Sequence, residues 1–140
     1  MIGIVVAAHQ NLAQELVRAA EGIVGRAEQV RALTLSYDEP TESARRRLER
    51  ALGEADTGDG VLLLTDLFGG TPTNLSLPFL EPGRVEVLAG VNLPILVKAL
   101  TARNEMDLVS LAAFLRDYGR RNIVLASEIW NQRAGTRTWR

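Results

Sequence analysis

The sequence predicts an α/β fold: an open, mostly parallel sheet with helices on both faces. Two observations lead to this prediction. Short apolar runs rich in β-branched residues alternate with longer segments in which apolar residues recur at helical spacing. The alternation continues over most of the 140 residues without an internal repeat or a low-complexity linker. Because strands separated by one helix pair in parallel through right-handed crossovers, this spacing favours a single covered sheet.

The first half of the chain contains two strand-and-helix units. Residues 2–8 form an apolar run typical of a strand that is buried on both faces, and a segment of helical spacing follows it and ends at Gly25. Residues 30–35 predict the second strand. Pro40 and Thr41 then open a second helix. Its apolar residues, which share one face, are Ala44, Leu48, Ala51, Leu52 and Ala55.

The third strand is the most apolar one. We expect it at residues 61–66, VLLLTD, near the centre of the sheet. The loop FGGTPTN and a short helix over residues 74–80 follow, and a fourth strand is expected at residues 84–89. If the strand order begins 2-1-3, as in flavodoxin-like sheets, the four strands take the order 2-1-3-4.

The last third of the chain predicts two helices and a final strand. Asn92 stands where an N-cap is expected, and Pro94 stands where the first helical residue is expected. A further helix is expected to end near Gly119. Residues 122–130, NIVLASEIW, predict a C-terminal strand, which we expect to run antiparallel to the others. This leaves residues 131–140 as a tail.

Composition argues against several classes of function. With 16 basic and 17 acidic residues the net charge is −1, which gives no field that would attract nucleic acid or an anionic membrane. The tail carries Arg133, Arg137 and Arg140 beside Trp139 without an acid, which indicates either a polyanion site or an ordinary solvated tail. Cysteine, a signal peptide and an apolar run of the ~20 residues of a membrane span are all absent, so we expect a cytoplasmic protein.

Two side chains predict a catalytic site. His9, the only histidine, follows the first strand, and Asp66 ends the third. In an open α/β sheet ligands bind beyond the carboxyl ends of the strands, where the strand order reverses, so both side chains are expected in one crevice. A carboxylate that accepts a hydrogen bond from one imidazole nitrogen leaves the other nitrogen free to attack an electrophile. This pairing is typical of nucleophilic catalysis.

The loop after Asp66 adds features that suit an anion. Gly69 and Gly70 allow backbone N–H groups to converge, and Thr71 offers a hydroxyl donor. A phosphoryl group on His9 would therefore meet hydrogen-bond donors. The same residues admit plainer roles: a surface histidine, a glycine turn, and an Asp66 side chain that caps the turn. Their coincidence at one sheet edge favours the catalytic interpretation.

Several other chemistries lack their motifs. The sequence has no G-x-x-x-x-G-K-[ST] loop, and Lys98 is the only lysine, which argues against P-loop nucleotide hydrolysis. No G-x-G-x-x-G follows the first strand and no G-x-S-x-G elbow occurs, so neither a dinucleotide-binding enzyme nor a serine hydrolase is indicated. We expect no metal and no organic cofactor, because a transition-metal site would have to be built from carboxylates.

Three segments resemble the IIA domain of mannose-type sugar phosphotransferase systems (PTS): the start IGIVVAAH, the block LLLTDLFGGTPTN and the junction VLAGVNLPILVKAL. The likeness implies one PTS EIIA type-4 domain over residues 1–130. It implies that His9 accepts a phosphoryl group from the carrier protein HPr and passes it to a IIB component. It further implies a cytoplasmic phosphotransferase that forms homodimers by exchanging the strand at residues 122–130.

The resemblance also implies roles for individual residues. Asp66 would orient His9 and stabilise its charge. The residues that border or bind the phosphoryl group would be Thr71, Gly69, Gly70 and Asn92. Gln10 departs from the family, which has a small residue after the histidine, and this puts the access route or the preferred donor in question. No IIB domain follows in the sequence, so we expect either an acceptor on another chain or no acceptor at all.

Three hypotheses follow for the function. The first is a phosphocarrier that works through a phosphohistidine and needs no metal clamp. The second is a regulatory binding module whose phosphorylation state at His9 controls docking to a partner protein. The third is an unrelated α/β protein that binds a small anion in the same loop. None of them names a sugar, because sugar specificity would reside in partner proteins.

Overall fold

The computed structural model describes residues 1–134, and the side chains of residues 1–132. In this part of the chain four strands form one sheet in the predicted order β2-β1-β3-β4. They are β1 (Gly3–Ala8), β2 (Val30–Thr34), β3 (Val61–Thr65) and β4 (Val85–Ala89). Every neighbouring pair is parallel, so the carboxyl ends of the four strands meet at one edge of the sheet.

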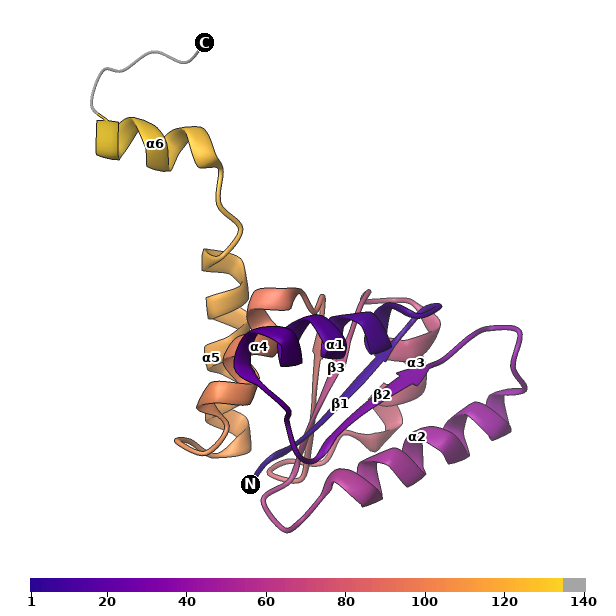
Figure 1. Ribbon diagram of the computed structural model, residues 1–140. Coiled ribbons are helices and arrows are strands. Elements are labelled where there is room, and N and C mark those ends of the chain that lie inside the picture. The colour runs from indigo at the N-terminus through magenta and orange to yellow at the C-terminus, as the bar shows by residue number, and fades with distance from the viewer. Residues whose placement is uncertain (135–140) are drawn as a thin grey trace.

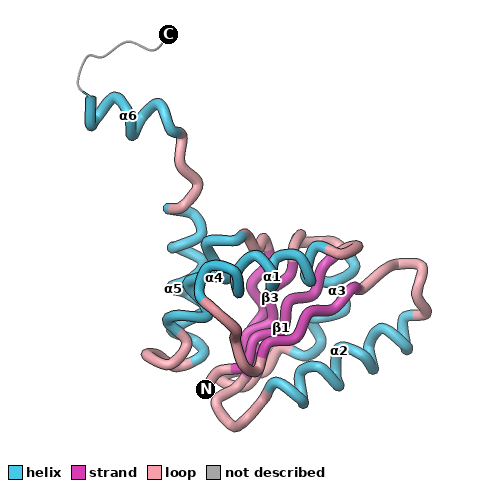
Figure 2. The backbone as a smooth tube through the Cα atoms, viewed as in Figure 1, coloured by secondary structure: helices cyan, strands magenta, loops and turns pink. Residues whose placement is uncertain are grey.

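Helices cover both faces of the sheet, as the sequence predicts (Figure 2). The helices of one face are α1 (Leu12–Val24), α4 (Leu93–Ala102) and α5 (Leu108–Arg121). The other face is covered by α2 (Thr41–Ala55) and by α3 (Thr71–Ser76), which continues into the 3-10 turn η1 (Leu77–Phe79). The α/β class with helices on both faces is therefore confirmed.

The two central strands separate two apolar cores. All six residues of β1 are buried, as are all five of β3. Because successive side chains of a strand point to opposite faces, Ile4 and Val6 pack under α1, α4 and α5, whereas Val5 and Ala7 pack under α2. Each buried aliphatic side chain contributes about 1.5–3 kcal/mol relative to exposure, so the centre of the sheet is a rigid base for residues at its ends.

Three local predictions are refined by the structure. Asn92 caps α4 as predicted, since its side-chain oxygen accepts from the backbone N–H of Ile95 at 2.9 Å, and Pro94 is the second helical residue. The short helix after the glycine loop begins at Thr71, earlier than predicted. Gly119 lies inside α5 and does not end it; a side chain there would collide with Ile95, so the glycine allows α5 to approach α4 closely.

The predicted C-terminal strand over residues 122–130 is wrong. Residues 122–125 lie outside regular structure, and α6 (Ala126–Ala134) follows. This segment stands away from the sheet, beyond the end of α5 (Figure 1), and its apolar side chains Ile123, Val124 and Leu125 are exposed. A strand needs a neighbouring strand for its backbone hydrogen bonds, whereas a helix satisfies them within the segment. No antiparallel strand joins the sheet in residues 1–134.

The rest of the tail lies outside the described residues. Arg137, Trp139 and Arg140 fall in residues 135–140, and the side chain of Arg133 is not among those described. The two interpretations of the basic tail therefore stay predictions. Within residues 1–134, no helix is long and apolar enough to cross a membrane.

Candidate active site

His9 and Asp66 lie side by side at the carboxyl edge of the sheet. His9 directly follows β1, and Asp66 directly follows β3, the neighbour of β1. The register pairs Ala7 with Thr65, so Asp66 lies level with Ala8, one position before His9. The prediction that the fold brings the two side chains into one site is therefore confirmed by their contact.

One oxygen of Asp66 holds His9 in two ways. Its Oδ2 atom accepts from the backbone N–H of His9 at 3.0 Å and contacts the ring atom Nδ1 at 2.8 Å. The side chain of Asp66 is 11% exposed, whereas that of His9 is 36% exposed. The carboxylate is thus enclosed and the imidazole reaches the surface.

The charge of Asp66 determines which ring nitrogen is free. Burial raises the pKa of the Asp66 carboxyl, but the hydrogen bonds from the backbone and ring of His9 outweigh burial, so this pKa lies below its usual value. An ionised carboxylate only accepts hydrogen bonds, so Nδ1 of His9 must carry the proton in this contact. Nε2 then keeps its lone pair and can attack an electrophile.

Gly70 lies directly against the imidazole ring. A methyl group in place of its hydrogen would be 2.9 Å from Cε1 and 3.6 Å from Nε2 of His9. This distance places the backbone of the glycine loop beside the reactive nitrogen. Gly69 has φ of +88°, a left-handed conformation that favours glycine, and allows the chain to turn sharply before α3.

Two threonines fix the base of this loop. The hydroxyl of Thr73 donates to the carbonyl of Leu67 at 2.7 Å, and it lies 2.6 Å from the hydroxyl of Thr65. Since Thr73 gives its proton to Leu67, Thr65 donates to Thr73. Sequence reasoning missed this pair, although the loop FGGTPTN contains two threonines and only the first was considered.

The remaining predicted site residues separate into two groups. Thr71 is the first residue of α3 and follows Gly70 directly, so it belongs to the loop beside His9. Asn92 instead uses its side-chain oxygen to cap α4, and it lines a hollow of about 170 Å³ together with Arg116 and Ile123. Its predicted role at the phosphoryl group stays a prediction.

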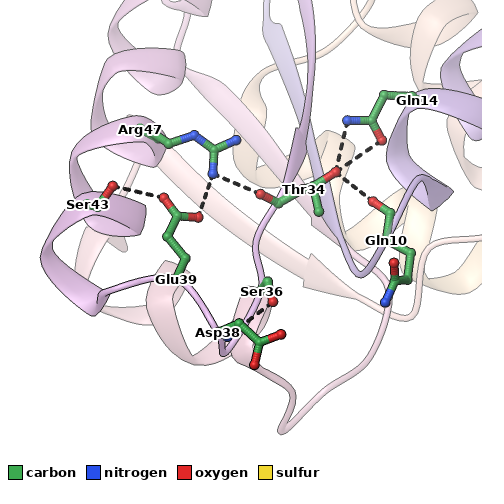
Figure 3. A network of polar contacts seen from close by, with 8 residues as sticks. All are labelled: Gln10, Gln14, Thr34, Ser36, Asp38, Glu39, Ser43 and Arg47. Atoms are coloured by element: carbon green, nitrogen blue, oxygen red, sulfur yellow. Dashed lines mark hydrogen bonds and ion pairs between the residues drawn. The ribbon is translucent and has the colours of Figure 1, made fainter.

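The turn after His9 is held by β2. Gln10 has φ of +52°, which is uncommon for a residue with a side chain. The hydroxyl of Thr34, the last residue of β2, donates to the carbonyl of Gln10 at 2.6 Å, and the amide of Gln14 donates to that hydroxyl at 3.1 Å (Figure 3). Sequence reasoning did not identify Thr34 or Gln14.

Comparisons with known proteins identify relatives of the whole fold. A family model described as PTS system fructose IIA component (EIIA-man) matches residues 3–115. The chain is 36% identical over 116 residues to a mannose-specific PTS EIIAB component of Escherichia coli strain K12, an alignment that covers 79% of this chain and 36% of that protein. It is 30% identical over 129 residues to a fructose-specific PTS EIIA component of Bacillus subtilis strain 168, covering 91% of this chain and 88% of the relative.

A solved structure is similar over nearly the whole fold. The PTS component EIIA from Streptococcus agalactiae superposes with a TM-score of 0.82 at 28% identity, covering 91% of this chain and 99% of the other. The chain spans about a third of the length of the EIIAB relatives and most of the length of the EIIA relative from Bacillus subtilis. The chain belongs to the EIIA-man family, the mannose/fructose-type EIIA components of the PTS.

Proposed function

We propose that this chain is a phosphocarrier that accepts a phosphoryl group from phospho-HPr on Nε2 of His9 and passes it to a IIB component. One observation carries the proposal above the others: Asp66 binds Nδ1 of a ring that is partly exposed, and Nε2 of the same ring is left without this contact. Family membership supports the reaction class, since EIIA components are phosphotransferase proteins. In this proposal residues 1–130 form the EIIA domain, and the protein acts in the cytoplasm.

In the proposed step, the lone pair of Nε2 attacks the phosphorus of the donor phosphohistidine. A nitrogen–phosphorus bond forms on His9 as the donor's nitrogen–phosphorus bond breaks, and the donor imidazole leaves with the electron pair. The proton on Nδ1 of His9 remains in place, so the ring of the phosphorylated residue gains positive character. The carboxylate of Asp66 stabilises that charge through the hydrogen bond at 2.8 Å.

The loop beside the ring supplies the donors for the phosphoryl oxygens. Gly70 approaches His9 closely enough for its backbone to meet a group bound to Nε2. Thr71 adds a hydroxyl at the next position, and Gly69 gives the chain the turn that this approach requires. Because the fold has already oriented these hydrogen-bond donors, they need little reorganisation when the negatively charged phosphoryl oxygens bind.

Stepwise reconstitution tests this function. The protein is mixed with radiolabelled phosphoenolpyruvate, enzyme I and HPr, and then with candidate IIB domains, and His9→Gln is the control. We expect an acid-labile label on the wild type, none on the variant, and onward transfer to a IIB domain. Labelling without transfer to any IIB domain would instead indicate a regulatory module, in which the phosphorylation state of His9 controls docking to a partner protein. Anion binding that Thr71→Ala abolishes, with no label on His9, would indicate the unrelated anion-binding protein.

The proposal includes a homodimer. Ile123, Val124 and Leu125 expose 78%, 57% and 63% of their surface on a segment that stands away from the sheet. A second copy of the chain would remove these side chains from water. Light scattering should give the mass of a dimer for the wild type and of a monomer for Leu125→Glu, whereas a monomeric wild type at micromolar concentration would contradict this part of the proposal.

A further inference from the structure

We propose that Thr34 is a positioning residue for His9: its hydroxyl holds the backbone turn at Gln10 and thereby the orientation of the reactive ring. The inference rests on the proposed function of His9 and deepens it. It starts from the contact between the Thr34 hydroxyl and the Gln10 carbonyl, at 2.6 Å. Thr34 ends β2 and Gln10 lies in the turn after β1, 24 positions away in the sequence, so the contact is a product of the fold.

The turn at Gln10 needs an external partner. A residue with a Cβ atom at φ of +52° is disfavoured by roughly 1–2 kcal/mol relative to the right-handed region. The side-chain amide of Gln10 points away from Thr34 (Figure 3), so it is the backbone carbonyl of Gln10 that forms the contact. The hydrogen bond from Thr34 is thus placed where it can offset the cost of the left-handed conformation.

Thr34 is itself held firmly. It pairs with Ala8 in the sheet, one position before His9. Its hydroxyl accepts from Gln14 at 3.1 Å, and its backbone carbonyl accepts from the guanidinium of Arg47 at 3.0 Å. Arg47 in turn contacts the carboxylate of Glu39 at 2.7 Å (Figure 3). The hydroxyl proton of Thr34 has two acceptors nearby, the carbonyl of Gln10 at 2.6 Å and the amide oxygen of Gln14 at 3.5 Å, and the much shorter contact favours Gln10.

The two strands beside β1 hold opposite sides of His9. Asp66, after β3, holds the ring and the backbone N–H of His9, and Thr34, at the end of β2, holds the carbonyl of the next residue. Loss of the Thr34 bond would leave the contacts of Asp66 on the other side in place and would allow the Gln10 peptide to rotate. Because transfer depends on the alignment of Nε2, a small rotation lowers the rate without removing any reacting group.

The test compares Thr34→Val, which removes the hydroxyl at nearly constant volume, with Thr34→Ser, which keeps it. Thr101→Val is the matched control, since the hydroxyl of Thr101 bonds only to carbonyls of its own helix, at 3.3 and 3.2 Å. We expect Thr34→Val to lower the rate of His9 phosphorylation by phospho-HPr about three- to tenfold, the effect of losing one hydrogen bond. Thr34→Ser and Thr101→Val should stay within twofold of wild type.

A second readout does not depend on phosphorylation. His9 is the only histidine, so its ring nitrogens give unambiguous signals in a long-range ¹H–¹⁵N spectrum. Wild type should show mainly the tautomer with the proton on Nδ1, and Thr34→Val should show a mixture of the two tautomers. A merely structural role would lower the unfolding temperature and leave this spectrum unchanged.

A rescue variant completes the design. Glycine adopts positive φ without cost, so Gln10→Gly should recover most of the rate lost in Thr34→Val. If Thr34→Val does not fold, Gln14→Leu removes the donor to the Thr34 hydroxyl and should give a smaller loss in the same direction. The proposal is overturned if folded Thr34→Val shows both the rate and the tautomer of wild type. If Thr34→Val does not fold, the same result in Gln14→Leu overturns it. Failure of wild type itself to accept a phosphoryl group would count against the proposed function, and the spectrum would still decide the role of Thr34.

Discussion

Replacing Gly70 by alanine should disable His9 while leaving the fold intact. Gly70 has φ of −83° and ψ of 170°, a conformation that alanine adopts without strain. The added methyl group would lie 2.9 Å from Cε1 of His9, and the next ring atom, Nε2, is 3.6 Å away. The clash therefore falls on the imidazole ring and spares the backbone around it.

The size of the effect follows from these distances. Carbon atoms in contact lie about 3.5–4.0 Å apart, so the ring must move by roughly 0.6–1 Å. A shift of that size is larger than the width of the usual hydrogen-bond range of about 2.7–3.2 Å, so it disturbs the 2.8 Å contact with Asp66 and moves Nε2 from its place. Misplacement of a reacting group by about 1 Å can cost on the order of 10²-fold in rate. We expect phosphorylation of His9 to slow about 10- to 100-fold in Gly70→Ala.

The assay is transfer of label from phospho-HPr under single-turnover conditions, together with chemical denaturation. The free energy of unfolding should change by about 1 kcal/mol or less, because the lost His9 contact is partly offset by the reduced freedom of the unfolded chain. Gly53→Ala is the control: Gly53 lies in α2 with nothing within 4 Å of the added methyl, so stability should rise slightly and the rate should not change. A Gly70→Ala protein that reacts at the wild-type rate would refute the proposed position of the ring.

Three further predictions concern stability. Asp66→Asn should unfold more easily than wild type at neutral pH, because folding lowers the pKa of the Asp66 carboxyl below its usual value. The difference should persist above about pH 4 and disappear as the pH falls through the lowered pKa, as urea denaturation at several pH values would show. Asn92→Ala should lose about 1 kcal/mol of unfolding free energy because the cap of α4 is removed, and Asn92→Asp should retain it; equal stability of all three proteins would contradict the cap. Gly3→Ala should be strongly destabilised in thermal unfolding, because its methyl group would collide with the carbonyl of Ala55. A melting temperature within a few degrees of wild type would argue against this close packing of α2 on β1.

The sheet could be predicted from the sequence because its central strands are buried on both faces. Such strands appear as short uninterrupted apolar runs, and β1 and β3 match the predicted residues 2–8 and 61–66 closely. The same signal failed at residues 122–130, since a short apolar run does not distinguish a strand from a helix by its periodicity. There the segment stands away from the sheet (Figure 1), so neither edge strand, β2 or β4, lies beside it, and that position is a property of the fold.

The candidate site was predictable where chemistry and strand ends coincide. His9 and Asp66 are reactive side chains at the ends of strands, so the rule for parallel sheets placed them together. Thr34 and Thr73 act through single hydrogen bonds to backbone carbonyls, and such contacts leave no pattern in the sequence. Gln10 was noted only for its size, whereas its positive φ is visible only in the structure.

The double contact of Asp66 with His9 has a consequence for the order of events. Since Asp66 holds His9 at both its amide and its ring, these two contacts keep the imidazole at one side of the protein. Under the proposed function, the protein that delivers a phosphoryl group and the protein that removes it would therefore bind the same surface in turn, and each would exclude the other while it is bound. Steady-state kinetics in which the concentrations of the donor protein and the acceptor protein are both varied should then show parallel double-reciprocal lines. An excess of either partner in its unphosphorylated form should act as a competitive inhibitor of the other partner.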